Sequence, residues 1–119
     1  LNRDGDILSD MVLALYGTLA GSESMMIGFD QQGDQSVVMA EAPHGTAPAL
    51  EGRHVANPMS MILAVAALLE QVRHDQLAEF GVRIREATME VCSSGIRTAD
   101  LGGSSRTEEF TSAVLSRLA

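Results

Sequence analysis

Residues 57–73, N-P-M-S-M-I-L-A-V-A-A-L-L-E-Q-V-R, contain the longest apolar stretch of this 119-residue chain and decide its fold class. Asn57 is a suitable N-cap and Pro58 suits the first helical position, so a helix is predicted over residues 58–73. Apolar residues occupy all sides of that helix until Glu70, so we expect it to be buried between layers. The stretch is too short to span a bilayer, which needs about 20 apolar residues.

Helical periodicity recurs on both sides of this stretch. Apolar residues at helical spacing predict helices over residues 7–16 and 76–93. A last helix is expected to begin at Ser105 or Thr107, with two glutamates in its first turn, and to end at Leu118.

Two short strands are predicted between the first helix and the apolar helix. Residues 24–29 and 37–40 are apolar, and the segment D-Q-Q-G-D at 30–34 has the composition of a turn between strands. Residues 41–58 form a loop rich in proline, glycine and histidine, and long loops of this kind are more often functional than simple connections. Helices with a few short strands indicate an α/β class, as one small domain or part of a larger one.

Charge and composition exclude several functions. The chain has 16 Asp and Glu against 8 Lys and Arg, a net charge of −8, and 3% aromatic residues. Such a chain is not expected to bind phosphate backbones or to stack nucleic-acid bases. All the basic residues are arginine, so no lysine can act as a base or form a Schiff base. The lone Cys92 fits a reducing compartment, and we expect a soluble cytoplasmic protein without nucleic-acid or membrane partners.

Asp6 and Asp10 lie one helical turn apart near the start of the first predicted helix. Two carboxylates at this spacing can share Mg²⁺ or Mn²⁺, which prefer oxygen ligands. The alternative, which the spacing alone favours, is that both carboxylates only complement the helix dipole.

A second candidate segment is P-H-G-T-A-P at residues 43–48. Gly45, between His44 and Thr46, would let backbone amides approach a ligand closely. Alternatively, its proline and glycine residues only turn a surface loop, and the segment by itself leaves both interpretations open.

The other polar and sulfur-containing residues are assigned structural roles. His54 and His74 are expected to be solvent-exposed, and Cys92 to be a small buried apolar residue. The 7 methionines lie mostly in apolar segments and are expected to belong to the core.

Four short motifs occur in this order along the chain: N-x-x-G-D-I-L-S-D (2–10), E-x-x-H-G-T-A-P (41–48), A-N-P (56–58) and R-T-x-D-L (97–101). Together they resemble the β-decarboxylating dehydrogenases, the family of the isocitrate, 3-isopropylmalate, homoisocitrate and tartrate dehydrogenases. The resemblance covers essentially the whole chain. The chain looks like the C-terminal third of such an enzyme, and it begins within the motif that resembles the family's metal-binding motif.

The resemblance implies the two-domain isocitrate/isopropylmalate dehydrogenase-like fold, with helices packed on a mixed sheet. Residues 1–21 would form the metal-binding helix of the dimer-forming domain, and residues 22–119 a portion of the large domain with the cofactor loop. The parent enzyme would be a homodimeric oxidoreductase that oxidises and decarboxylates a 2-hydroxy acid bearing a 3-carboxylate. The motifs mix features of the isocitrate and isopropylmalate branches, so they leave open which hydroxy acid is used.

The resemblance also implies the site residues. Asp6 and Asp10 would bind the Mg²⁺ or Mn²⁺ that chelates the substrate's hydroxyl and carboxylate groups. NAD or NADP would be held by residues of the loop and of the helix start, namely His44, Gly45, Thr46, Ala47, Pro48 and Asn57. The family's catalytic Lys and Tyr and its substrate-binding arginines have no match here. We therefore expect no catalytic residue in this segment and no turnover by it alone.

Cofactor choice departs from the family pattern. NAD-using members commonly carry Asp after the H-G-S/T-A-P motif, and many bacterial NADP-using members carry Lys-Tyr there and a Tyr in the later loop. This chain has Ala49 and Leu50, with Ala99 in the later loop. Loss of cationic and phenolic partners harms a phosphate more than a diol, so NAD is favoured over NADP. These departures also leave an alternative: a non-catalytic relative or regulatory subunit that stabilises a catalytic partner.

Overall fold

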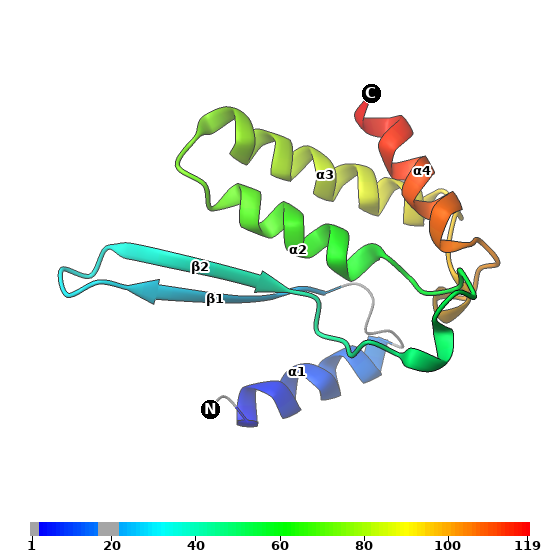
Figure 1. The fold of residues 1–119 in the computed structure, drawn as a ribbon, viewed down its shortest axis with the longest axis horizontal. Coiled ribbons are helices and arrows are strands. Elements are labelled where there is room, and N and C mark those ends of the chain that lie inside the picture. The colour runs from blue at the N-terminus through cyan, green and yellow to red at the C-terminus, as the bar shows by residue number, and fades with distance from the viewer. Residues whose placement is uncertain (1–2, 17–21) are drawn as a thin grey trace.

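The computed structural model describes residues 3–16 and 22–119, without the side chains at positions 3, 6, 9, 13 and 16. Four helices and one pair of strands follow one another along the chain (Figure 1). Their bounds are α1 Arg3–Tyr16, β1 Ser24–Phe29, β2 Gln35–Glu41, α2 Met59–Glu70, α3 Asp75–Ser93 and α4 Thr107–Leu118. Two short 3₁₀ helices, η1 Pro48–Leu50 and η2 Ala99–Leu101, lie in the loops before α2 and α4. The predicted α/β class is confirmed.

The core lies where α2, α3 and α4 meet. Helices α2 and α3 run side by side in opposite directions, and α4 packs on α3 near its C-terminal end (Figure 1). Phe110 of α4 is fully buried there. The other buried apolar residues of this cluster are Met59, Leu63, Ala87, Val91 and Val114.

Gly81 allows α2 and α3 to approach closely. A Cβ atom at this position would lie 2.7 Å from the backbone oxygen of Ala66 and 3.0 Å from the backbone nitrogen of Glu70. One helical turn further along α3, Arg85 forms ion pairs with Glu70, at 2.9 Å, and with Glu23 just before β1, at 2.7 Å. These contacts hold the start of the hairpin against the helix pair.

The strands form an antiparallel hairpin in which Ser24 pairs with Glu41. The Asp30 side chain fixes the turn, because its Oδ1 accepts hydrogen bonds from the backbone N–H groups of Gln32 and Asp34, both at 2.9 Å. Helix α2 packs on the hairpin, mainly on β2. Of the mixed sheet that the resemblance implies, the described residues thus supply one antiparallel pair.

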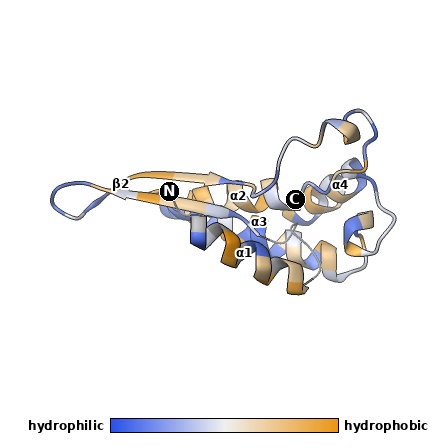
Figure 2. Ribbon diagram, turned by 90° about the horizontal axis from the view of Figure 1, so that it is seen from below, coloured by the Kyte–Doolittle hydropathy of each residue, from blue (hydrophilic) through white to orange (hydrophobic). Residues whose placement is uncertain are grey.

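Helix α1 lies outside the packing of the other described helices and strands. No other described helix or strand packs against it. Among its described side chains, the large apolar ones are at least half exposed: Ile7, Leu8, Met11, Val12 and Leu15. Figure 2 shows apolar residues along α1 and along both strands of the hairpin.

The expected end of α2 and the expected core position of the methionines are wrong. The helix ends at Glu70 rather than at residue 73, because the N–H groups of Gln71 and Val72 bond to carbonyls three residues back as the chain turns toward α3. One side of α2 is open, and Met61 and Val65 on it are about half exposed. Six methionines are exposed and only Met59 is buried, since the apolar faces that carry them have no cover within the described residues.

Candidate functional site

The loop between β2 and α2 exposes a run of backbone amides. Residues 44–49 are all exposed, and the N–H groups of Gly45, Thr46 and Ala47 make no hydrogen bond to any described residue. Ala47 adopts a left-handed conformation, with φ 41°, just before η1. The His44 ring is held locally, with Nδ1 3.0 Å from the Gly45 oxygen. Exposed N–H donors next to a glycine suit the binding of an anionic or polar ligand.

Asn57 connects this loop to η2. Its Oδ1 accepts a hydrogen bond from the Met59 N–H at 2.9 Å, which confirms that Asn57 caps the start of α2. Its Nδ2 donates to Oδ2 of Asp100 at 3.0 Å. The other oxygen of that carboxylate accepts a hydrogen bond from the Thr98 hydroxyl at 2.5 Å. Hydrogen bonds at both the amide oxygen and the amide nitrogen therefore fix the orientation of the Asn57 side chain.

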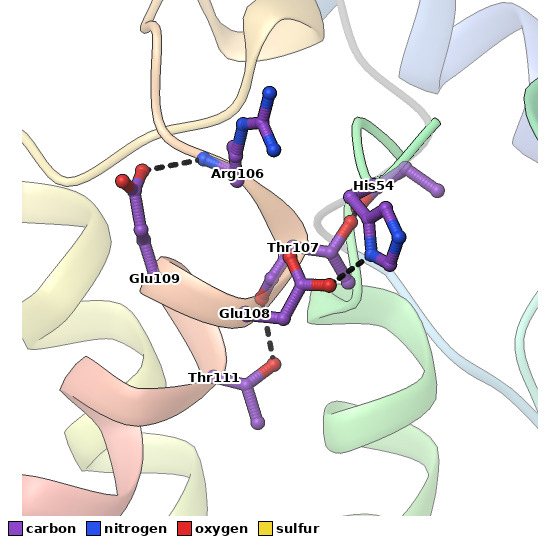
Figure 3. A network of polar contacts seen from close by, with 7 residues as sticks. His54, Arg106, Thr107, Glu108, Glu109 and Thr111 are labelled. Atoms are coloured by element: carbon purple, nitrogen blue, oxygen red, sulfur yellow. Dashed lines mark hydrogen bonds and ion pairs between the residues drawn. The ribbon is translucent and has the colours of Figure 1, made fainter. Parts of the chain in front are cut away.

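The first turn of α4 holds the stretch of loop just before Asn57. The Thr107 N–H donates to the His54 oxygen at 3.1 Å, and the Thr107 hydroxyl donates to the Ala56 oxygen at 2.5 Å. His54 has a left-handed backbone, with φ 57°, and its Nδ1 contacts Oε1 of Glu108 (Figure 3). These contacts join segments more than fifty positions apart in the sequence.

Electrostatics favour the charged form of Glu108. The pKa of its carboxyl lies below the ordinary value of 4.5, first because of a hydrogen bond from its own backbone N–H and then because of His54. Beside it, Glu109 accepts a hydrogen bond from the Arg106 N–H at 2.7 Å, which caps the start of α4 (Figure 3). Acidic residues in a first helical turn also complement the helix dipole.

The metal candidates lie on α1. Asp6 and Asp10 stand one turn apart on the helix backbone, Asp10 is exposed, and the side chain of Asp6 lies outside the described residues. Within the described residues, no group of three or more His, Cys, Asp or Glu side chains could hold a metal ion. Carboxylate oxygens suit Mg²⁺ or Mn²⁺, which usually take one or two carboxylates together with water and substrate oxygens.

Sequence reasoning found the loop but not the residues that support it. His54 is exposed, as predicted, but its contact with Glu108 has no local sequence signal. The same is true of Thr107. Asp100 could have been found, because it is the acidic residue of the R-T-x-D-L segment.

The similarity to known proteins extends over nearly the whole chain. The family model described as isocitrate/isopropylmalate dehydrogenase matches residues 1–114. This chain belongs to the isocitrate/isopropylmalate dehydrogenase family. The resemblance in the four motifs is thereby confirmed at the level of the family.

Individual relatives of this isocitrate/isopropylmalate dehydrogenase family member come from both branches. The chain is 40% identical over 118 residues to the mitochondrial isocitrate dehydrogenase [NAD] catalytic subunit 5 of Arabidopsis thaliana, with 98% of this chain and 29% of that protein covered. It is also 40% identical over 121 residues to 3-isopropylmalate dehydrogenase B of Aspergillus niger, at 98% and 32% coverage. The chain thus spans less than a third of the length of these relatives.

A solved structure supports the fold of this family member. The crystal structure of isocitrate dehydrogenase from Methylococcus capsulatus superposes with a TM-score of 0.77 at 35% identity, covering 96% of this chain and 32% of that one. Among the residues described, no helix has the length and apolar character needed to cross a membrane.

Proposed function

We propose that the enzyme to which this chain belongs carries out NAD(P)-dependent, divalent-metal-dependent oxidative decarboxylation of a 2-hydroxy acid with a 3-carboxylate, isocitrate-like or 3-isopropylmalate-like. This chain would supply the metal and dinucleotide sites. The observation that carries the proposal is the exposed H-G-T-A-P loop, with three backbone N–H groups that make no hydrogen bond to any described residue, in a chain that matches the family over residues 1–114.

The dinucleotide site would consist of the loop and the start of α2. The N–H groups of residues 45–47 are available to polar groups of the cofactor. Asn57 uses one amide hydrogen and one acceptor position within the protein. An asparagine amide has two of each, so one hydrogen and one lone pair remain to contact the adenine. Because Asp100 and the helix start fix this side chain, little rotational freedom would be lost on binding.

The charge around the site favours NAD over NADP. The Asp100 carboxylate lies beside Asn57, and Glu51 is exposed in the same loop. A 2′-phosphate would add negative charge close to these carboxylates. Ala49, Leu50 and Ala99 offer it no cationic or phenolic partner.

Asp6 and Asp10 would hold Mg²⁺ or Mn²⁺. When bound, the metal ion would act as a Lewis acid toward the oxygen atoms of the hydroxy acid. The two carboxylates would fix the ion on α1 and lower its net charge. Their separation by one helical turn supports this role, and other ligands would come from substrate and water.

The isolation of α1 supports a division of the chain into residues 1–21, in the dimer-forming domain, and residues 22–119, in the large domain. The apolar stripe of α1 has no partner among the described helices and strands, which suits a homodimer interface in the complete enzyme. The lone Cys92 is a free thiol and suits a reducing compartment, for which we propose the cytoplasm.

A non-catalytic role is the second candidate. Ala49, Leu50 and Ala99 match neither cofactor pattern of the family, which suits a subunit that stabilises or regulates a catalytic partner. Isolation of the protein together with a longer, lysine-containing family member would support this role. NAD(P)⁺ binding by the chain itself would favour the first proposal.

Isothermal titration of NAD⁺ and NADP⁺ into the purified 119-residue chain, with and without Mn²⁺, tests the proposal. We expect binding of NAD⁺ more tightly than NADP⁺, and Mn²⁺ binding that is weakened in Asp10→Asn. Asp34→Asn, a change to an exposed carboxylate of the hairpin turn, is the matched control. Failure of the chain to bind either dinucleotide would contradict the assignment of that site to this chain, and equal Mn²⁺ binding by both variants would contradict the metal site.

A further inference from the structure

We infer that Thr107, in the first turn of α4, is a positioning residue for the dinucleotide loop. The inference rests on the proposed function, because it assigns a new residue to the loop that would hold NAD(P). Thr107 belongs to none of the four motifs that carry the family resemblance. It would act through the loop backbone, without touching the cofactor.

Thr107 makes two hydrogen bonds to one short stretch of loop. Its backbone N–H donates to the His54 oxygen, and its hydroxyl donates to the Ala56 oxygen. The side chain is half-buried. The accepting carbonyls are one and three positions before Asn57, so Thr107 fixes the direction in which the chain enters the start of α2.

The loop needs this support because of the conformation of His54. A histidine with φ 57° lies in the left-handed region, which is unfavourable for residues other than glycine. Such a conformation persists when surrounding contacts hold it. Here Thr107 binds the His54 carbonyl, and Glu108 contacts the ring from the same turn of α4. We call this set of contacts, from Thr107 and Glu108 to His54 and Ala56, the α4 clamp.

The α4 clamp rests on a rigid base. Phe110 lies one turn further along α4 and is fully buried in the core. The loop is held at Asn57 as well, by Asp100. Loss of the Thr107 hydroxyl would free residues 54–56 to adopt other conformations while the core stays intact. The fraction of molecules with a binding-ready loop would fall, and the apparent Kd for the dinucleotide would rise in proportion.

The test compares Thr107→Val, which lacks the hydroxyl but keeps the backbone N–H, with Thr107→Ser, which keeps both. Thr111→Val is the matched control, since the Thr111 hydroxyl donates only to a carbonyl of its own helix, that of Thr107. Amide hydrogen exchange of the ligand-free chain is measured by NMR, and the Kd for NAD⁺ by calorimetry. We expect Thr107→Val to speed exchange at the two hydrogen-bonded amides of this contact, those of Arg53 and of residue 107, but not in α2 and α3, and to raise the Kd about fivefold, the effect of one hydrogen bond. Thr107→Ser should restore both values, and Thr111→Val should change neither.

The two measurements separate this inference from the proposed function. If the unmodified chain binds NAD⁺ and Thr107→Val leaves the Kd and loop exchange unchanged, the positioning role is overturned and the dinucleotide site stands. If the unmodified chain binds no dinucleotide, the site assignment fails and the positioning role fails with it. If amide exchange were nevertheless faster in Thr107→Val, the α4 clamp would stabilise the loop without any role in dinucleotide binding. Uniformly faster exchange throughout the helices would show general destabilisation and would also overturn the inference.

Discussion

Asn57 and Asp100 are 43 positions apart in the sequence, yet Nδ2 of Asn57 donates a hydrogen bond to Oδ2 of Asp100 over 3.0 Å. The bond joins the start of α2 to η2, and so connects the two loops that precede α2 and α4. Both residues belong to the motifs that carry the family resemblance, A-N-P and R-T-x-D-L. The pairing gives these motifs a common structural function.

Exchanging the residue types of Asn57 and Asp100 should show whether their hydrogen bond stabilises the fold. Asn57→Asp keeps the oxygen that caps α2 but replaces the amide donor with a carboxylate facing Asp100. We expect a loss of about 1–2 kcal/mol in the free energy of unfolding, measured by urea denaturation at neutral pH. The double variant Asn57→Asp/Asp100→Asn places a donor opposite an acceptor again and should recover most of that loss. Additive effects of the two single changes would show that the pair is not coupled.

Glu108 should contribute to stability in a pH-dependent way. Its pKa in the folded protein is lowered, so folding favours the ionised form. The contribution is therefore present above the ordinary pKa of 4.5 and is lost as the pH falls through the lowered value. We expect Glu108→Gln to be less stable than the unmodified chain at neutral pH, with a difference that shrinks on acidification below that range.

Thermal unfolding of both proteins at a series of pH values checks this expectation. Glu86→Gln controls for the loss of one negative charge at an exposed position on α3. A difference between Glu108→Gln and the unmodified chain that grows toward acid pH would contradict the assigned sign.

Gly81→Ala should destabilise the helix pair. The added methyl group would lie 2.7 Å from the Ala66 oxygen, and backbone atoms of α2 cannot move aside easily. We expect a loss of about 1–3 kcal/mol in urea denaturation, as for other overpacked sites. Gly45→Ala is the matched control, because nothing lies within 4 Å of its added Cβ. Equal free energies of unfolding for the two variants would contradict this prediction, because α2 and α3 would then accommodate the added methyl group without strain.

Phe110→Ala tests where the core lies. The ring is fully buried between α4 and the other helices, and its removal should cost about 3–5 kcal/mol. The same change at Phe29, which is 66% exposed at the end of β1, should cost less than about 1 kcal/mol. Calorimetric unfolding of both variants gives the comparison. A larger effect at Phe29 would place the stabilising contacts in the hairpin.

The sequence predicted elements whose signals are local. The strand at Ser24–Phe29 and the start of α4 at Thr107 agree with the prediction, because turn residues and acidic first-turn residues mark these boundaries within a few positions. The end of α2 was predicted three residues too late. The apolar run stops at Leu69, but glutamate, glutamine and arginine also suit a helix, so residues 70–73 carry no stop signal. The helix ends because the chain reverses to pack α3 on α2.

Of the candidate site, the loop at residues 43–48 was predicted as a loop, but its support was not. The contacts of His54 and Asn57 come from residues more than forty positions away, and periodicity carries no information about such pairs. The left-handed backbone of His54 was equally hidden, since a histidine does not mark that conformation as a glycine would. The roles of Asp6 and of the dinucleotide residues stay predictions.

The exposed methionines have a chemical consequence. Six of the 7 lie at the surface, on α1, the hairpin, the outer side of α2 and α3, whereas Met59 is 3% exposed in the core. Mild peroxide would convert these surface thioethers to sulfoxides, which are polar and chiral. The apolar faces would become hydrophilic while the centre of the helix cluster stayed chemically unaltered. In the 119-residue chain by itself, oxidation would therefore fall first on the surfaces that suit contact with other protein, before it reached the packing that keeps the chain folded.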